Sequence, residues 1–111
     1  MPTLHYTPAA ARVLARLEKG RHADARRLRR VRRALERLAV DPRHPGLCSH
    51  RYSCLPGYEH TTTWTSYVDQ GAGAWRLHWT WGPTDTTPTA HAQSEPDNTV
   101  VVTVLRVGPH L

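Results

Sequence analysis

The sequence is poor in cysteine and acidic residues and has no long apolar run. Its 111 residues include two cysteines, Cys48 and Cys54, whose spacing does not fit a zinc-binding pair. Two thiols do not make a disulfide framework, so we expect free cysteines in a cytoplasmic protein; a local disulfide is the alternative for an exported one. No stretch approaches the roughly 20 apolar residues of a membrane span, and we expect no secretory signal. These absences predict one small domain over residues 1–111, with no membrane partner.

Positive charge, by contrast, is plentiful and unevenly placed. Fifteen basic residues face nine acidic ones, and every basic residue but Lys19 is arginine. Eight arginines fall between Arg21 and Arg37, opposed there by only Asp24 and Glu36. Such a stripe attracts polyanions, whether nucleic acid or an acidic protein. The alternative is a solvated helix face in which codon bias has replaced lysine by arginine. Three of these residues are our candidates for RNA contact: Arg29, Arg30 and Arg33.

The first third of the chain has the pattern of two helices joined by a short turn. Thr7 and Pro8 suit a helix N-cap and the first helical position, and Gly20 is placed to end that helix. Apolar residues recur every three or four positions from about His22 to Val40, and a proline two residues later ends the second helix. The short connection at Gly20 predicts an antiparallel helical hairpin.

The rest of the chain favours strands and turns. Residues 43–58 are rich in proline and glycine, so irregular structure is expected there. Gly82–Asn98 is polar without apolar periodicity and is expected to be a long, mobile hairpin loop. Threonine-rich, aromatic and β-branched stretches predict the strands. These are Thr3–Tyr6, Thr61–Val68, Ala74–Trp81 and Thr99–Val107.

Apolar and polar residues alternate strictly from Ala74 to Trp81. Successive side chains of a strand point to opposite faces, so Arg76, His78 and Thr80 share one face. The opposite face then carries Trp75, Leu77, Trp79 and Trp81. This apolar face needs a cover, which the helical hairpin provides, and the polar face is expected to stay open and concave. The alternative is that the tryptophan face is the open one and forms an RNA-binding platform on which bases stack. Arginine forks match phosphate oxygens and histidine exchanges protons near neutral pH, so the polar face predicts a phosphate-bearing substrate.

The expected fold is therefore α+β. A short N-terminal strand and a helical hairpin pack on one face of a small antiparallel sheet, in the order strand, helix, helix, strand, strand, strand.

This order, the basic hairpin and three segments resemble the RelE/ParE superfamily of toxins from type II toxin–antitoxin systems. The segments are residues 41–47 (Asp-Pro-Arg-His-Pro-Gly-Leu), 74–79 (Ala-Trp-Arg-Leu-His-Trp) and 104–110 (Val-Leu-Arg-Val-Gly-Pro-His). In the RelE branch the resemblance implies a ribosome-dependent endoribonuclease that cuts mRNA. It implies a catalytic or phosphate-binding role for Arg76 and, as in YoeB-like members, proton transfer by His110. Glu59 is the acid nearest to the position of that group's glutamate base. The partners implied are the ribosome, mRNA and a cognate antitoxin, usually acidic and DNA-binding.

Metal-independent RNA cleavage needs a base, an acid and a cation that stabilises the phosphorane. Arg76 is our candidate for the cation, with a cross-sheet surface pairing as its structural alternative. His78 lies roughly 6.5–7 Å along the strand from Arg76 and competes with His110 for proton transfer; its alternative is a histidine hydrogen-bonded within the sheet. His50, Arg51 and Tyr52 are candidates for phosphate contact and base stacking, against a plain loop role.

No metal or other cofactor is predicted, because no two of the eight histidines stand at i, i+4 on a helix and none makes a Cys/His ligand set. Two other functions stay open. A ParE-like chain would inhibit DNA gyrase through its basic hairpin without cutting RNA. A non-catalytic member would bind only its antitoxin and operator DNA.

Overall fold

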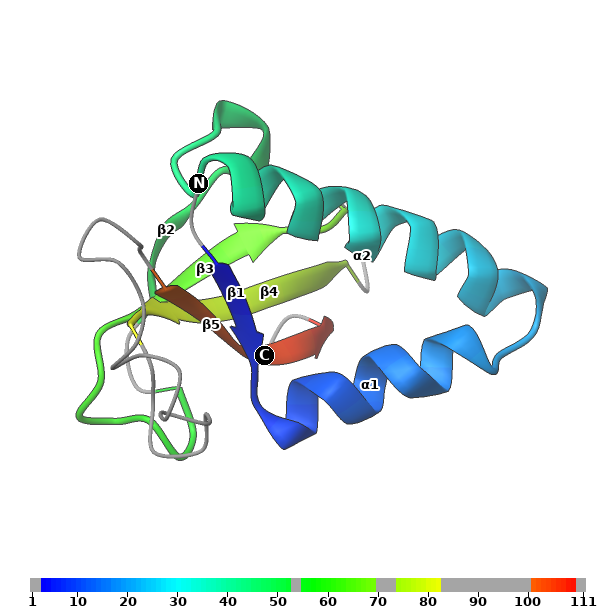
Figure 1. Cartoon of the computed structure of the whole chain (residues 1–111), viewed down its shortest axis with the longest axis horizontal. Coiled ribbons are helices and arrows are strands. Elements are labelled where there is room, and N and C mark those ends of the chain that lie inside the picture. Colours follow the sequence, from blue (N-terminus) through cyan, green and yellow to red (C-terminus); the bar gives the residue numbers. More distant parts are fainter. Residues whose placement is uncertain (1–2, 53–54, 70–73, 83–100, 110–111) are drawn as a thin grey trace.

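The computed structural model describes residues 3–52, 55–69, 74–82 and 101–109 (Figure 1). It is an α+β fold with two helices and a five-stranded sheet. The elements in chain order are β1 (Thr3–Tyr6), α1 (Pro8–Glu18), α2 (His22–Val40), the 3-10 turn η1 (Pro45–Leu47), β2 (His50–Tyr52), β3 (Thr63–Tyr67), β4 (Trp75–Trp81) and β5 (Val101–Pro109).

The sheet is mixed, with the strand order β1-β5-β4-β3-β2. β1 runs parallel to β5, whereas the other neighbours are antiparallel. The expectation of a purely antiparallel sheet of four strands is therefore wrong in two respects. Both helices and three strands separate β1 from β5 in the chain, so the two strands are not joined by a hairpin and can pair in parallel. β2 was missed because a three-residue edge strand between proline-containing segments has no periodicity to detect.

Local capping interactions account for the position of α1. The Thr7 side chain accepts a hydrogen bond from the Ala10 backbone N–H at 3.2 Å, and Pro8 follows as the first helical residue. The Thr7 hydroxyl also donates to the Leu105 carbonyl at 2.8 Å, so the same side chain ties the start of the helix to β5. The predicted helical hairpin is confirmed, with α2 spanning the predicted residues.

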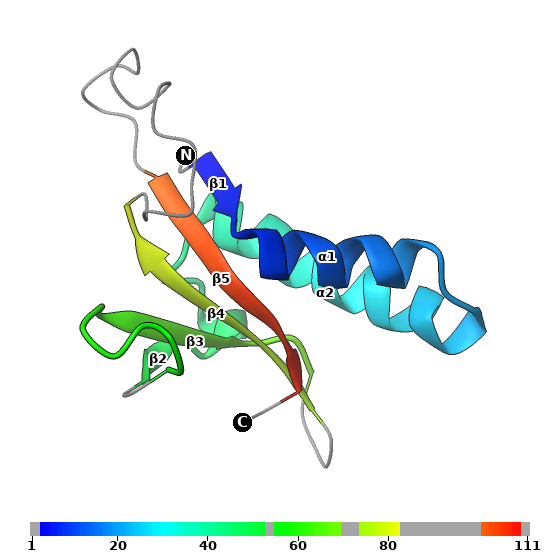
Figure 2. The ribbon, with the colours of Figure 1, turned by 90° about the horizontal axis from the view of Figure 1, so that it is seen from below.

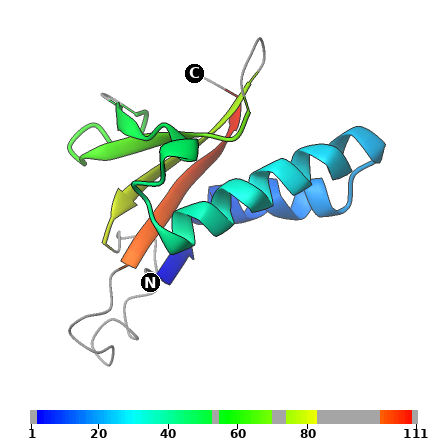
Figure 3. The ribbon, with the colours of Figure 1, turned by 90° about the horizontal axis from the view of Figure 1, so that it is seen from above.

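The two helices pack on one face of the sheet, and their connected ends project past it (Figures 2 and 3). We call the covered side of the sheet the helix face. The core between the layers is apolar and includes Val31 and Leu38 of α2, Leu77 and Trp79 of β4, and Val104 of β5. The apolar residues that recur every three or four positions along α2 are therefore buried against alternate residues of the strands.

The opposite side, which we call the far face, is polar but largely buried. Arg76 is 9% exposed and His78 is 1% exposed, so the expectation of an open face is wrong for the middle of β4. Threonine hydroxyls here donate to backbone carbonyls, as Thr63 does to Tyr52 at 2.7 Å and Thr80 does to Thr62 at 2.8 Å. The polar groups are thus buried together with hydrogen-bond partners, as burial requires.

The pairing of β4 with β5 shifts register between His78 and Trp79, where Leu105 is the extra residue on β5, so β4 itself keeps its alternation. Trp79 is buried, whereas Trp81 is 41% exposed, so the helices do not cover the whole apolar side of β4. No helix in the described ranges is both long and apolar enough to cross a membrane. The expected loop Gly82–Asn98 lies, after Gly82, outside the described residues.

Candidate functional site

The sheet register aligns four side chains in one row across the far face. His50 of β2 pairs with Thr65 of β3, Thr65 with His78 of β4, and His78 with Arg106 of β5. Residues directly opposite in a sheet point to the same face, and three strand spacings cover roughly 14–15 Å. A basic and imidazole-bearing row therefore crosses most of the sheet. His50 and Arg106 at its ends are exposed, whereas the two residues between them are buried.

Arg76 lies in the next row and is held in place from two directions. Its guanidinium carbon sits 3.8 Å from the centre of the Tyr67 ring, a cation–π contact. Its Nη1 group donates to the carbonyls of Asp69 at 2.9 Å and Trp75 at 3.1 Å. Within the described part of the chain, its Nε and Nη2 donors make no hydrogen bond and no carboxylate neutralises it. A fixed cation with unused donors is suited to an anionic oxygen.

Asp69, at the turn after β3, organises this end of the sheet. One carboxylate oxygen accepts the Trp75 backbone N–H at 2.7 Å, and the other lies 3.6 Å from a guanidinium nitrogen of Arg30 on α2. Its carbonyl accepts from Arg76. The carboxylate therefore offsets charge on the helix rather than on Arg76, which leaves the far face positive.

A glycine opens space beside Arg76. Gly108 of β5 is the cross-strand partner of Arg76, so a side chain there would project onto the far face next to the guanidinium. Among the described residues, a methyl group placed at Gly108 would meet no atom closer than Nε of Arg106 at 4.0 Å. The described residues thus leave room for one small group between the two arginines.

The two predicted histidines of this face differ in access to solvent. Nδ1 of His78 is hydrogen-bonded to the Thr65 hydroxyl at 2.8 Å, and the Tyr52 ring lies edge-on at 4.8 Å. His50 is exposed, and its ring contacts that of Tyr67 at 6.1 Å. Nδ1 of His50 is 3.0 Å from the Cys48 carbonyl; a carbonyl only accepts, so a neutral His50 carries its proton on Nδ1. Nε2 of His50 is then a basic lone pair at the surface.

Glu59 is not brought to Arg76. It lies in the loop before β3, where its carboxylate accepts the Gly57 backbone N–H at 3.1 Å. Glu59, Arg51 and Tyr52 instead line a separate cavity of about 310 Å³ at the β2 edge. Arg51 pairs with Trp64, whose side chain packs against the core, so its side chain leaves the sheet on the helix face.

The arginines of α2 form a second positive region. Arg29, Arg30 and Arg33 are all exposed, and their spacing places them on one side of the helix. Only Arg30 among these three has an ion pair in the described structure. Arg27 lies over the Trp75 ring at 4.7 Å and so contributes to packing.

Two residues of the far face, Tyr67 and Arg106, were not among the predicted site residues. Tyr67 was treated only as a strand residue, and Arg106 only as part of a motif. Alternation along β3 contains the signal for Tyr67, whereas Arg106 reaches the far face because of the extra residue Leu105 on β5. The proximity of both residues to Arg76 depends on register, which the sequence does not specify. His110 lies outside the described residues.

The described residues contain no group of three or more histidines, cysteines or acidic residues able to hold a metal ion. Cys48 has a free, exposed thiol. A comparison with protein-family models finds no match, and comparisons with curated proteins and with solved structures find none at the significance threshold. Membership of the RelE/ParE superfamily therefore stays a prediction from the residues quoted above.

Proposed function

We propose that this protein is a toxin of a type II toxin–antitoxin system that cuts ribosome-bound mRNA without a metal ion. The observation that carries the proposal is Arg76, a nearly buried cation on a stack with Tyr67 whose Nε and Nη2 donors are unused within the described chain. The likeness of this strand to the RelE branch supports the same role.

In this proposal Arg76 binds the scissile phosphate and stabilises the charge that develops on it. A preorganised cation in a site of low water content stabilises such charge more strongly than a mobile surface arginine. Arg106, a diagonal neighbour on β5, adds a second positive charge beside the space at Gly108.

Proton transfer then falls to an imidazole. His50 is a far-face candidate, because it is exposed and its ring contacts Tyr67, as Arg76 does, whereas His78 is buried. It takes the proton of the 2′-hydroxyl, and His110 remains the candidate acid from the resemblance. Glu59 has no role as a base at Arg76 in this proposal, because the Glu59 carboxylate accepts a hydrogen bond within its own loop.

The exposed arginines of α2 suit a polyanion outside the reaction centre. They are proposed to contact ribosomal RNA during cleavage and an acidic antitoxin when the toxin is inhibited. The same surface would serve gyrase inhibition equally well, so the chemistry at Arg76 is what separates these two functions.

The test is cleavage of a defined mRNA on purified ribosomes, read by primer extension. We expect cuts within codons for the wild type and about a 100-fold lower rate for Arg76→Ala, as for loss of one preorganised donor. Arg12→Ala is the matched control, since Arg12 is an exposed arginine of α1. Its rate should equal that of the wild type.

A second variant tests the site without touching Arg76. Gly108→Leu fills the space beside the guanidinium and should block cleavage, whereas Gly108→Ala should retain it. Circular dichroism checks that each variant is folded. Intact mRNA with the wild type, or full activity in folded Arg76→Ala, contradicts the proposal; intact mRNA together with gyrase inhibition supports the ParE-like alternative.

A further inference from the structure

Three tryptophans surround a cavity on the helix face, at the end of the sheet away from the tip of the helical hairpin. Trp64, Trp79 and Trp81 line a space of about 290 Å³ together with residues 42–45, Cys48 and Ser49. The Trp64 and Trp79 rings are stacked at 5.9 Å, and Trp81 stands edge-on to Trp79 at 5.4 Å. This volume is close to the lower limit for small-molecule sites, so it suits one planar ring system. We call it the tryptophan pocket.

A chain of hydrogen bonds fixes the walls of the tryptophan pocket. The Trp79 indole N–H donates to the Ser66 hydroxyl at 2.8 Å, and the Ser66 and Ser49 hydroxyls are 2.6 Å apart. The Ser49 hydroxyl donates to the Pro42 carbonyl at 3.1 Å, so the proton between the two serines comes from Ser66. The segment opposite the tryptophans is thereby tied to the sheet. The pocket exists before a ligand enters, which lowers the entropic cost of binding.

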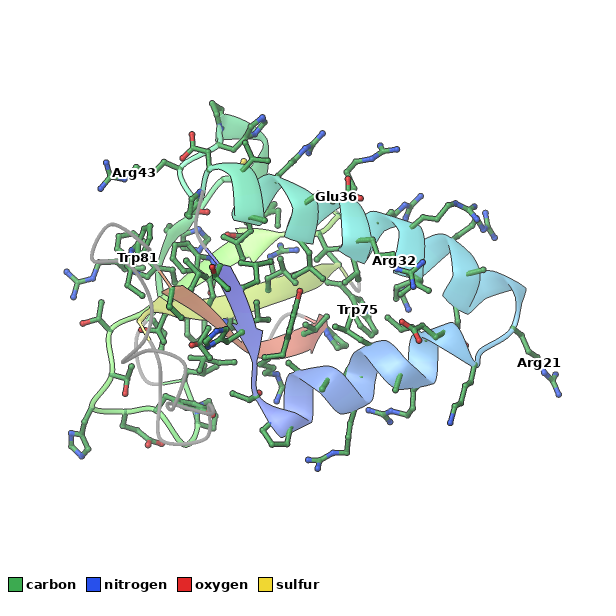
Figure 4. The ribbon with its side chains drawn as sticks, in the orientation of Figure 1. Arg21, Arg32, Glu36, Arg43, Trp75 and Trp81 are labelled. Atoms are coloured by element: carbon green, nitrogen blue, oxygen red, sulfur yellow. The ribbon has the colours of Figure 1, made fainter. Side chains whose placement is uncertain are left out.

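The described residues at the rim of the pocket offer hydrogen-bond donors. Nδ1 of His44 accepts the Gly46 backbone N–H at 2.9 Å, so a neutral His44 carries its proton on Nε2. Arg43 is exposed and lies at the same end of the molecule as Trp81 (Figure 4). Among the described residues that line the pocket, none is aspartate or glutamate. Aromatic walls with a cationic rim favour a planar ligand that carries negative charge.

We infer that the tryptophan pocket binds one unpaired nucleotide of an RNA strand, with the base against Trp81 and the phosphate on Arg43. The inference rests on the proposed RNA-directed function. Every base has a π-face, so stacking tolerates any sequence, and arginine recognises phosphate oxygens through its planar fork. Trp81 is 41% exposed, which leaves part of its ring available to a base.

The test is the affinity of the full chain for a fluorescein-labelled 2′-O-methyl hexauridylate, measured by anisotropy. The methyl groups block attack by the 2′-oxygen, so binding is measured without cleavage. We expect Trp81→Ala to raise the dissociation constant about 5- to 100-fold, as for loss of one stacking partner. Trp81→Phe should restore most of the affinity, and Arg43→Ala should weaken binding and flatten its salt dependence.

Val40→Ala is the matched control, because Val40 is an exposed apolar side chain, 60% exposed, that does not line the pocket. Its affinity should equal that of the wild type. Equal affinities for folded Trp81→Ala and the wild type would overturn the inference, and so would unchanged binding by Arg43→Ala. The inference would also be overturned if a proline-rich peptide quenched the tryptophan fluorescence of the protein and the hexauridylate did not. That result would identify a protein ligand.

Failure of this inference is separable from failure of the proposed function. If ribosome-bound mRNA is cut in an Arg76-dependent manner while Trp81 variants bind hexauridylate normally, only the pocket inference fails. If binding depends on Trp81 but no mRNA is cut, the nuclease proposal fails and the pocket stands as an RNA-binding site.

Discussion

The two faces of the sheet are both buried, but different forces hold them. On the helix face, Leu77 and Trp79 meet apolar residues of α2 and β5, so burial of hydrocarbon supplies the stability. On the far face, His78 is just as inaccessible, yet its contacts include the Thr65 hydroxyl and the Tyr52 ring. Burial alone therefore does not distinguish a packing surface from a site. The polar face, held by directional hydrogen bonds, keeps Arg76 oriented for a ligand.

The largest effect on stability is expected from Leu77→Ala on the helix face. The Leu77 side chain is fully buried in the apolar cluster, and its truncation removes transfer free energy and leaves a cavity. We expect the free energy of unfolding to fall by about 2–5 kcal/mol. Urea denaturation measures it. If Leu77→Ala lowers the free energy of unfolding by less than Thr65→Val on the far face, then apolar burial is not the stronger source of stability.

Thr65→Val on the far face should have a smaller but clear effect. Valine preserves the shape of threonine while removing the 2.8 Å hydrogen bond to Nδ1 of buried His78. Loss of a buried polar partner costs about 1–3 kcal/mol. Thr61→Val is the control, since Thr61 is exposed in the preceding loop, and it should change stability little. If the two variants are equally stable, hydrogen bonding does not hold this face.

The smallest effect on stability is expected from ionisation of Tyr6, which packs against the core at the edge of the helix face. Burial raises the pKa of its phenol above the ordinary value of 10.0. The folded state therefore favours the neutral phenol, so this contribution to stability is present below pH 10 and is lost as pH rises toward the raised pKa.

Tyr6→Phe has no phenol to ionise. The free energy of unfolding of the wild type, relative to this variant, should decrease between pH 9 and pH 11. Urea denaturation of both proteins at each pH isolates Tyr6, since all other residues are common to them. A difference that is constant with pH would show that the phenol is not desolvated.

Much of the helical layer was predictable because its signals are local. The Thr7 cap, Pro8 and the apolar spacing of α2 act over at most four residues, and both helices begin at their predicted positions. The strand β2 and the parallel pairing of β1 with β5 were not predictable. Each depends on contacts between residues far apart in the chain, for which the sequence carries no register signal.

The candidate site divides in the same way. Alternation singled out Arg76 and His78, and charge clustering singled out the arginines of α2. The stack of Arg76 on Tyr67 and the approach of Arg106 follow from register, whereas the separation of Glu59 follows from the path of the loop before β3. The tryptophans were expected under the helices, and the exposure of Trp81 was missed because helix length and position decide how far the cover extends.

By itself, the sequence determined the composition of each face: tryptophan and leucine on one side of β4, arginine, histidine and threonine on the other. Side-chain alternation is a property of the extended backbone and needs no partner strand. Only the tertiary structure decided which polar residues are buried and which reach solvent. That outcome depends on the strands and loops that lie against each face, and their approach is a balance of long-range packing and hydrogen bonding that no short stretch of chain encodes.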